Sequence, residues 1–299
     1  MQSFSLKKHA PRVSRSMVFF GVLVVFMMLL AACGNPAPAP TTTSSSPDLI
    51  TPGTLTVGSD TTYPPQEFVD TTSGQAVGFD IDLITAVASK MGLKVKIVKA
   101  DFGTIIDSLA AKRYDVVISA VTINADREKK VDFVPYFNAG ESLLVPKGNP
   151  KNITAIEATC GLKIGVQNGT TEQDDANAAS AACTKASKPA ITITALQNQT
   201  DVVQLLATGR VDATYQDSPV TDYYLSQNTA GQFEVGGSVV NAAHEGIAVR
   251  KGDTKMLNPV QNALAQLKGD GTYNQLFTKW HLSDSQKIAY SEQRNSAAA

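Results

Sequence analysis

The chain has 299 residues, of which 43% are hydrophobic and 18% charged, and its formal net charge is −1 at pH 7. Charges of both signs are scattered along it, so it lacks the clustered basic residues of a nucleic-acid-binding protein, and we expect no nucleic-acid partner.

The first 32 residues are typical of a secretion signal. Four basic residues and no acidic one precede an uninterrupted run of apolar or small residues over 17–32. That run is too short to span a bilayer comfortably. It ends in Leu30-Ala31-Ala32-Cys33, which is similar to the bacterial lipobox, where cleavage precedes the Cys and the Cys carries lipid. We therefore expect residues 1–32 to be a lipoprotein signal peptide and Cys33 to be lipidated, an uncut signal anchor being the alternative.

Removal of this signal takes away four basic residues and changes the formal charge from −1 to −5. The segment after Cys33 is rich in Pro, Thr, Ser and Ala, and we expect residues 33–52 to form the lipidated end and a flexible tether. Roughly 245 residues remain, enough for a large core and two lobes.

The rest of the chain alternates between strand-like and helix-like segments. Strands are expected at 54–57, 93–98, 116–118, 141–145, 163–166, 191–196, 211–215 and 246–249. Helices are expected at 82–91, 103–111, 202–206, 220–225, 257–267 and 273–280, with a further helix opening after a turn at 168–171. This alternation predicts an α/β protein with mostly parallel sheets. The rhythm starts near residue 54 and again near residue 163, so we expect two lobes with a ligand cleft between them.

The cysteines and histidines bear on disulfides and metals. If Cys33 carries lipid, Cys160 and Cys183 remain as a pair. Outside the cytoplasm such a pair usually forms a disulfide, two buried thiols being the alternative.

The chain after the signal holds two histidines, His244 and His281, and neither has ligand spacing to a Cys or a carboxylate. We therefore expect no metal site.

Several motifs follow one another in the order seen in one protein family. They are Val57-Gly58-Ser59-Asp60 with Tyr63-Pro64-Pro65, Gly78-Phe79-Asp80-Ile81-Asp82-Leu83, Phe102-Gly103-Thr104, Arg127 to Phe133, Gly169-Thr170-Thr171, Asp212 to Asp217, and Gly271-Thr272-Tyr273. Over nearly its whole length after the tether, the chain resembles the polar amino-acid-binding proteins of ABC importers, the type-3 extracellular solute-binding family. The resemblance implies a periplasmic-binding-protein-like fold of type II. Lobe I would comprise residues 53–139 and 244–299 and lobe II residues 140–243, joined by hinge strands near 138–143 and 241–246.

The resemblance also implies a site for a free amino acid. Arg127 would hold the α-carboxylate, for which its planar guanidinium is suited, although by position alone it could be a solvated residue of a charge run. Asp217 would hold the α-ammonium, the alternative being a cap of the following helix. Because these two residues belong to different lobes, binding would close the lobes.

The remaining expected contacts define the side-chain end and the main-chain donors. Asp60 would face the ligand side chain, with Tyr63 and Phe102 as aromatic walls, unless Phe102 is ordinary core. A carboxylate beside aromatic faces suits a basic or amide-bearing side chain. The full set is Asp60, Tyr63, Phe102, Ser119, Ala120, Thr122, Arg127, Gln167, Gly169, Thr171 and Asp217. Asp80 and Asp82 are expected to be structural. Gln66, where an aromatic is frequent, and Ala120, where some members have a hydroxyl, depart from the family pattern.

The function implied is that of a binding protein rather than an enzyme. It would capture a polar L-amino acid, use no cofactor, deliver the ligand to ABC permease subunits and be a monomer. It would lie outside the cytoplasm, held at the bacterial cell membrane by its N-terminal lipid. One alternative is an enzyme on the same fold, a dehydratase or lyase acting on a small acid through Asp60, Asp217 and His244. The other is a ligand-sensing module.

Overall fold

The computed structural model describes residues 46–227 and 231–288. The expected signal peptide, Cys33 and most of the expected tether lie outside the described residues. Those that are described belong to one compact unit of the chain. No helix among them is long and apolar enough to cross a membrane.

An eight-stranded sheet organises the fold, in the order β5-β1-β6-β11-β7-β10-β8-β9. The strands are β1 (Thr54–Ser59), β5 (Lys94–Lys99), β6 (Val116–Val117), β7 (Val131–Pro146), β8 (Lys163–Gln167), β9 (Thr192–Leu196), β10 (Ala213–Asp217) and β11 (Phe233–Arg250). Strands β5, β1 and β6 are parallel, as are β10, β8 and β9, whereas β7 and β11 run antiparallel to their neighbours. A small second sheet contains β2 (Thr62–Tyr63), β3 (Glu67–Val69) and β4 (Ala76–Val77). The predicted α/β class is confirmed.

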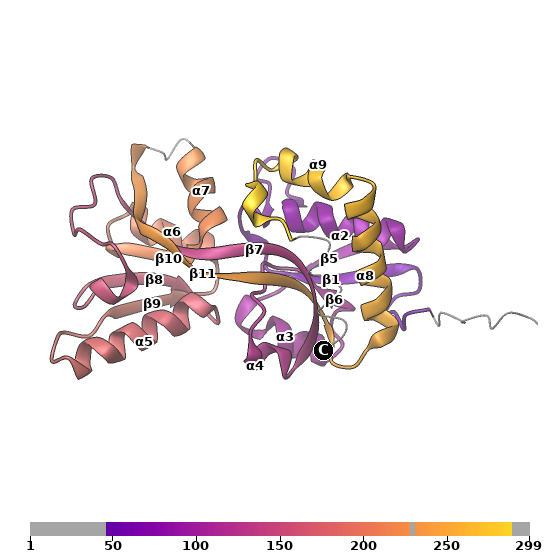
Figure 1. Ribbon diagram of the computed structural model, residues 1–299, viewed down its shortest axis with the longest axis horizontal. Helices are drawn as coiled ribbons and strands as arrows, with labels where there is room; N and C mark the ends of the chain where they lie inside the picture. The colour runs from indigo at the N-terminus through magenta and orange to yellow at the C-terminus, as the bar shows by residue number, and fades with distance from the viewer. Residues whose placement is uncertain (1–45, 228–230, 289–299) are drawn as a thin grey trace, which may run out of the picture. The chain divides into compact units, whose positions relative to one another are not determined.

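The helices cover the strands, as Figure 1 shows. They are α2 (Phe79–Lys90), α3 (Ile105–Ala110), α4 (Ala125–Glu128), α5 (Thr171–Lys185), α6 (Gln199–Ala207), α7 (Ser218–Ser226), α8 (Thr254–Gly269) and α9 (Thr272–Lys279). Short 3₁₀ turns lie at Phe102–Thr104, Ile156–Ala158 and Asp284–Gln286. The helix expected from residue 82 begins earlier, at Phe79, since Asp80 and Asp82 lie in its first turn, where acidic side chains favour the helix N-terminus.

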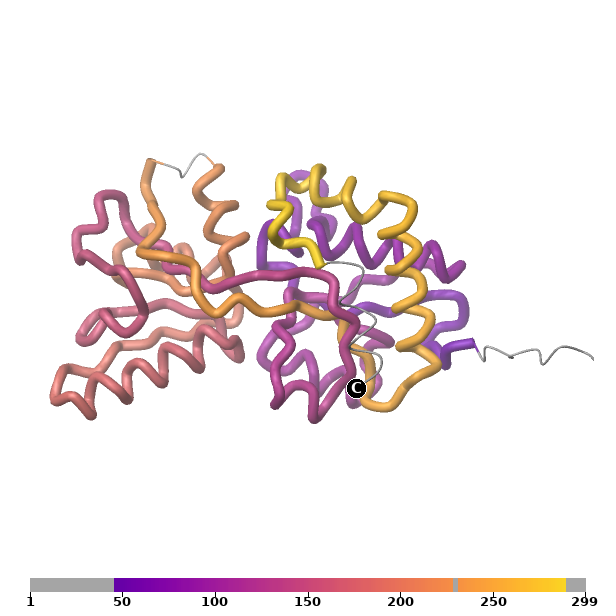
Figure 2. The backbone as a smooth tube through the Cα atoms, viewed as in Figure 1, coloured from indigo at the N-terminus to yellow at the C-terminus, as the bar shows by residue number. Residues whose placement is uncertain are grey.

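Strands β7 and β11 are much longer than the sequence indicates. They have 16 and 18 residues, against expected strands over 141–145 and 246–249. They run side by side and join the two groups of helices, as Figures 1 and 2 show. The middle of β11, residues 237–242, is exposed and interrupted by irregular pairing, so it shows no apolar alternation. The expected hinge segments lie on these two strands.

Two large apolar clusters stabilise the fold. One contains Leu55, Leu83 and Phe277, from β1, α2 and α9. The other contains Ile164 and Tyr215, from β8 and β10, together with part of α5. Fully burying one such large apolar side chain contributes about 1.5–3 kcal/mol. Strand β7 supplies residues to both clusters and so connects them. The exact boundaries of the two expected lobes stay a prediction.

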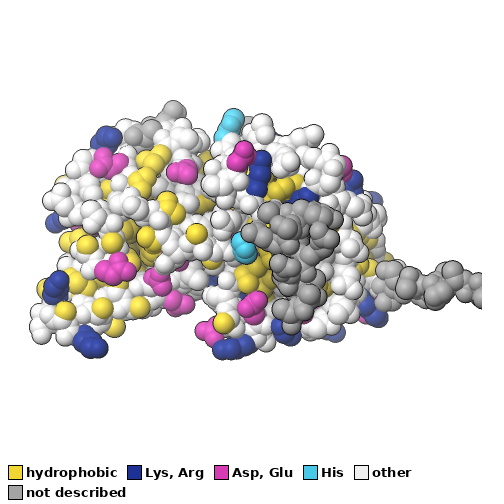
Figure 3. All heavy atoms as spheres, viewed as in Figure 1, with side chains coloured by type: hydrophobic (Ala, Val, Ile, Leu, Met, Phe, Trp, Pro, Cys, Tyr) yellow, Lys and Arg dark blue, Asp and Glu magenta, His cyan; other side chains and the backbone are white. Residues whose placement is uncertain are grey.

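A disulfide joins Cys160 to Cys183, whose Cα atoms are 5.6 Å apart. It ties the segment before β8 to the end of α5, 23 residues further along. The expected disulfide is therefore confirmed. On the face drawn in Figure 3, Lys and Arg side chains are interspersed with Asp and Glu.

Candidate ligand-binding site

Most of the expected ligand contacts line one small pocket. Nine of the eleven line it: Tyr63, Phe102, Ser119, Ala120, Thr122, Arg127, Gln167, Thr171 and Asp217. The other two touch this lining, because Asp60 accepts a hydrogen bond from Gln167 and Gly169 accepts one from Arg127. Thr170 and Glu172 complete the pocket. The fold thus brings the expected residues together, and their contact with a ligand stays a proposal.

Arg127 leaves the charge run in which it lies. The short helix α4 begins after Asn124, whose side chain accepts a hydrogen bond from the Arg127 backbone N–H at 2.9 Å. Asp126 and Glu128 on either side of Arg127 are exposed, whereas Arg127 is half-buried. Helix α4 therefore turns this one side chain of the run toward the pocket.

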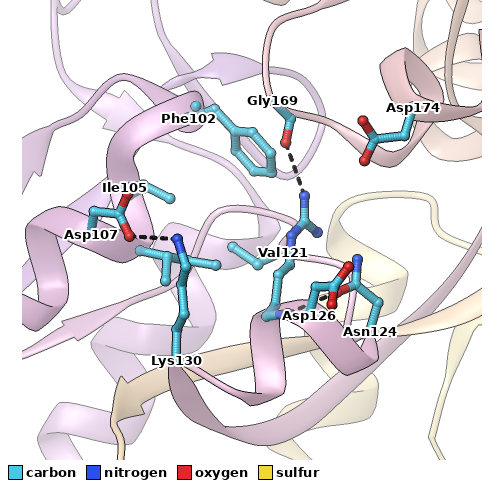
Figure 4. A pocket seen from close by; sticks show the side chains of 12 residues that line it. Phe102, Ile105, Asp107, Val121, Asn124, Asp126, Lys130, Gly169 and Asp174 are labelled. Carbon is cyan, nitrogen blue, oxygen red and sulfur yellow. Dashed lines mark hydrogen bonds and ion pairs between the residues drawn. The ribbon is translucent and has the colours of Figure 1, made fainter. Parts of the chain in front are cut away.

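The Arg127 guanidinium contacts both sides of the pocket. Its Nη1 donates to the Thr122 carbonyl at 2.8 Å and its Nη2 donates to the Gly169 carbonyl at 3.1 Å, the second bond being drawn in Figure 4. The guanidinium carbon lies 5.4 Å from the centre of the Phe102 ring. Phe102 is therefore a wall of the site rather than only a core residue. Burial lowers the pKa of Arg127, and the carboxylates of Glu172 and Asp217 oppose that shift.

Asp217 ends strand β10 and lines the pocket. Its Oδ2 accepts a hydrogen bond from the Tyr63 hydroxyl at 2.9 Å. Within the described residues its side chain makes no capping bond to α7. Burial raises the pKa of Asp217 to about 7, Glu141 adds to that shift and Arg127 opposes it. The geometry thus favours the pocket over the capping alternative.

Asp60 follows β1 and is 1% exposed. Its Oδ2 accepts hydrogen bonds from the Thr62 hydroxyl and from Gln167 Nε2, the latter at 2.9 Å. Burial raises the pKa of Asp60, and the two hydrogen bonds and Lys99 oppose the shift. Gln167, which lines the pocket, thus holds the Asp60 carboxylate directly against the pocket lining.

Gly169 lies at the turn that opens α5, where its main chain comes close to that of Gly103. Its φ of +81° is in the left-handed region, and a Cβ on it would lie 2.5 Å from the Cα of Gly103. Only glycine fits both conditions. The next residue, Thr170, caps the helix by accepting a hydrogen bond from Gln173 N. The first N–H groups of this 15-residue helix thus point to one end of the pocket, which favours a carboxylate there.

Glu172 is a pocket residue that the sequence analysis missed. It is 2% exposed, and its Oε1 has no hydrogen-bond partner within the described residues. Burial raises its pKa well above the ordinary value, and Asp217 and Glu141 add to that shift. The sequence holds a signal for it, since Glu172 falls on the same helix face as the buried Ala176 and Cys183.

Ser119 and Ala120 line the pocket, but their polar groups point to its rear. The Ser119 hydroxyl donates to Glu67 Oε1 at 2.7 Å and accepts from Asp60 N at 3.0 Å. The Ala120 N–H donates to Asp80 Oδ2 at 2.9 Å. The pocket wall is thus supported by a buried acidic layer.

Asp82 is fixed away from the pocket. Its Oδ2 accepts hydrogen bonds from Lys279 Nζ at 2.7 Å and from Trp280 Nε1 at 2.6 Å. Like Asp80, it does not line the pocket. Both aspartates therefore have structural partners, in line with the expectation for this motif.

A second hollow lies on the other side of Arg127. It shares Phe102 and Arg127 with the first pocket, and Gly169 lines it as well. An ion pair between Lys130 and Asp107, 2.8 Å long, lies at its edge, as Figure 4 shows. Arg127 and Phe102 thus separate the small pocket from a wider outer space.

Comparisons with known proteins agree with this fold. The family model "Bacterial extracellular solute-binding proteins, family 3" matches residues 55–283. The chain therefore belongs to the family 3 extracellular solute-binding proteins.

Curated relatives of this chain are named as binding proteins. The lysine/arginine/ornithine-binding periplasmic protein of Escherichia coli is 34% identical over 245 residues, which are 80% of this chain and 91% of that protein. The arginine-binding protein ArgT of Corynebacterium glutamicum is 31% identical over 251 residues, 83% of this chain and 81% of its own.

Solved structures extend the comparison. An ancestral arginine-binding protein bound to arginine has 39% identity and a TM-score of 0.71, covering 76% of this chain and 98% of that one. AncCDT-1, an ancestral amino acid-binding protein and precursor of cyclohexadienyl dehydratase, also has 39% identity, with a TM-score of 0.67, covering 76% of this chain and 95% of that one. The fold is therefore shared by binding proteins and by a precursor of an enzyme.

Proposed function

We propose that this protein captures a polar L-amino acid outside the cytoplasm and delivers it to the permease of an ABC importer. One observation carries the proposal: a cation, Arg127, and an anion, Asp217, line the same small pocket. A free amino acid carries the complementary pair of charges on its main chain. The family membership and the names of the relatives support the same function.

In the proposed pose, Arg127 binds the α-carboxylate through its planar fork. The N-terminus of α5, with Gly169 and Thr171, adds donors to the same group, and Thr122 lies beside it. Asp217 binds the α-ammonium, and its own carboxylate is oriented by Tyr63.

The side-chain end of the pose lies toward Asp60 and Gln167. A buried carboxylate with an amide beside it suits a basic or amide-bearing side chain, and Phe102 offers an aromatic face to a cation. Relatives named for lysine, arginine and ornithine support a basic ligand. Binding would bring lobe I (53–139 and 244–299) and lobe II (140–243) together about the hinge segments of β7 and β11.

Isothermal titration calorimetry against the twenty common amino acids and ornithine tests the ligand class. A basic or amide-bearing amino acid should bind most tightly, and mass spectrometry of what co-purifies should find it. Incubation of the best ligand with the protein should leave it chemically unchanged, because we propose binding without turnover. His244, which the enzymatic alternative would use, does not line the pocket. Appearance of a product would favour the enzyme instead.

The membrane attachment is a separate part of the proposal. It rests on the sequence around Cys33, with the tether giving the binding domain room to move. The protein would act as a monomer, tethered at the membrane beside its permease. Cys33→Ala should release a folded, ligand-binding protein from the membrane fraction. Wild-type protein with no acyl mass at Cys33 would contradict the anchor and leave the ligand proposal standing.

A further inference from the structure

Three carboxyl groups are buried directly behind the pocket wall. Glu67 is 1% exposed, Asp80 0% and Glu245 1%, and they come from β3, α2 and β11. None of them lines the ligand pocket. Buried carboxylates are costly unless they are neutralised or paired, so a cluster of three in one place requires a physical explanation.

Two members of the cluster hold the polar backbone of the pocket wall. Asp80 Oδ2 accepts hydrogen bonds from the Ala120 N–H at 2.9 Å and from the Tyr136 hydroxyl at 2.6 Å. Glu67 Oε1 accepts from the Ser119 hydroxyl, which in turn accepts from the Asp60 N–H. Ala120 and Asp60, both expected ligand contacts, are thus each fixed through one of these carboxyl groups.

Ala120 shows that this support is needed. Its φ of +47° lies in the left-handed region, which costs a residue with a Cβ roughly 1–2 kcal/mol. Such a conformation persists only where the surroundings hold it in place. The bond from Ala120 N–H to Asp80 is one of the contacts that hold it.

The second carboxyl oxygens of Glu67 and Asp80 indicate that a proton lies between these two side chains. Glu67 Oε2 and Asp80 Oδ1 each have no hydrogen-bond donor within the described residues. The two carboxyl groups are close together, because Glu67 and Asp80 bind the consecutive residues Ser119 and Ala120, and the charge of Asp80 raises the pKa of Glu67. Two adjacent carboxyl groups can hydrogen-bond each other when one of them carries a proton, and one shared proton would satisfy both orphan oxygens. The described residues contain no group of three or more His, Cys, Asp or Glu that could hold a metal ion in its place.

We propose that Glu67 and Asp80 share one proton and that this acid pair positions Ala120 and Asp60 in the amino-acid site. The pair acts through those residues and does not touch the ligand. This inference rests on the proposed function, because Ala120 and Asp60 are ligand contacts only if the pocket binds an amino acid.

The charges around the pair make it sensitive to alkaline pH. Burial raises the pKa of Glu67 well above its ordinary value, and the neighbouring Asp80, Asp60 and Glu245 raise it further. Burial also raises the pKa of Asp80, to about 6, while the Tyr136 hydroxyl and the Ala120 N–H oppose that shift. Because both values are raised, the stabilisation is present at low pH. It is lost as pH rises through the pKa at which the shared proton leaves.

Amide variants test the shared proton directly. In Glu67→Gln, the amide oxygen still accepts from Ser119 and the amide N–H₂ donates to Asp80. In Asp80→Asn, the amide oxygen still accepts from Ala120 and the N–H₂ donates to Glu67. Either single variant therefore replaces the shared proton with a fixed donor. The double variant places two N–H₂ groups face to face, and one acceptor arrangement must be lost.

The measurements are affinity for the tightest-binding common amino acid by calorimetry and the melting temperature of ligand-free protein, both from pH 5 to 8.5. Each single variant should keep its affinity within about threefold of wild type and show a smaller fall in melting temperature on the alkaline side, the remaining fall belonging to other buried carboxyl groups such as Asp217. The double variant should bind at least tenfold more weakly and melt lower than the two singles predict together. Asp82→Asn, on the same helix turn but outside the cluster, should leave the affinity and the shape of the pH profile as in wild type, although the weaker bonds to Lys279 and Trp280 lower its melting temperature at every pH.

Two results would overturn the inference. One is a double variant whose losses merely add the effects of the singles. The other is a single variant whose alkaline fall in melting temperature is as large as that of wild type. Both can be read from melting curves of ligand-free protein, so they stand even if no amino acid binds. Failure of wild type to bind any amino acid would instead overturn the proposed function, and with it the positioning role but not the shared proton.

Discussion

The Tyr63 hydroxyl donates a hydrogen bond to Asp217 Oδ2 at 2.9 Å and accepts one from the Asp217 backbone N–H at 3.0 Å. One phenol oxygen therefore fixes both the carboxylate and the backbone of a residue 154 positions away. Tyr63 lies on β2 of the small sheet, and Asp217 ends β10 of the large sheet. Tyr63 therefore orients Asp217, the proposed partner of the ligand ammonium, in the ligand-free protein.

Arg127→Ala should nearly abolish amino-acid binding. Removing one partner of a desolvated charge pair typically costs ~2–5 kcal/mol, which is about thirty- to several-thousand-fold in affinity. Calorimetry on the best wild-type ligand gives this loss, and the melting temperature of ligand-free protein should change little. Arg127→Lys keeps the charge without the planar fork, so its affinity should lie between those of wild type and Arg127→Ala. Unchanged affinity in Arg127→Ala would show that the proposed pose is wrong.

Affinity should fall as the pH drops below about 7. The pKa of Asp217 is raised to about 7, so below that value the ligand ammonium must displace a proton from it. The loss should approach tenfold per pH unit, and calorimetry in two buffers of different ionisation enthalpy should detect the released proton. In ligand-free protein the sign is opposite. The raised pKa stabilises the fold at low pH, and that contribution is lost as pH rises through about 7.

Two variants at this position separate charge from orientation. Asp217→Asn should remove both the binding and the proton release. Tyr63→Phe deletes one hydrogen bond to a charged group, about 1.5–3 kcal/mol, and should weaken binding while retaining the proton release. A flat pH profile in wild type would argue that Asp217 does not meet the ammonium.

Asp60→Asn should change which amino acid is preferred rather than whether one binds. The variant keeps an oxygen to accept from Thr62 or Gln167 but loses the negative charge. Affinity for basic amino acids should therefore drop more than affinity for amide-bearing ones. The ratio of the two affinities, measured by calorimetry, is the test. Equal losses for both classes would place Asp60 away from the ligand side chain.

Gly169→Ala should weaken binding beyond its effect on stability. The added Cβ would meet Gly103 at 2.5 Å, so the two sides of the pocket could not approach as closely. Gly209 provides a matched control, since its φ is +67° but a Cβ there has no neighbour within 4 Å. Gly209→Ala should incur similar backbone strain, lower the melting temperature and retain full affinity. Equal affinity in the two variants would contradict a close approach during binding.

Removal of the Cys160–Cys183 disulfide should lower the free energy of unfolding by about 3 kcal/mol, because the bond limits the freedom of the unfolded chain. Denaturant unfolding of the Cys160→Ala, Cys183→Ala double variant against wild type measures the difference. Non-reduced wild type, once unfolded, should show no thiol from this pair. Two titratable thiols there would contradict the bond.

The sequence was informative wherever burial followed a regular period. The apolar stripe Leu83, Ile84 and Val87 predicted α2, and alternation or apolar runs located most strands. The central parts of β7 and β11 could not be predicted in this way, because these strands are defined by their pairing with each other rather than by a buried face.

The supporting residues of the site could not be derived in the same way. Glu67 bonds Ser119, 52 residues away, and Asp80 bonds Tyr136, 56 residues away. No local pattern marks such partners, and an acidic residue in a short strand is ordinarily a surface residue. The motif residues Arg127 and Asp217 were recognised through family resemblance, whereas their periodic context alone would have assigned them to the surface and to a helix cap.

Phe233 pairs with Pro146, and the Lys147 N–H donates a hydrogen bond to the Gln232 carbonyl. The segment between residues 147 and 232 therefore begins and ends at the same place in the fold. During synthesis on the ribosome, the two apolar clusters are then completed in an order that differs from the order in which they begin along the chain. The apolar cluster around Ile164 and Tyr215 has all of its members once residue 215 has emerged, whereas the cluster begun at Leu55 waits for Phe277. The middle of the nascent chain can therefore fold first, while the earliest strands remain without their covering helices.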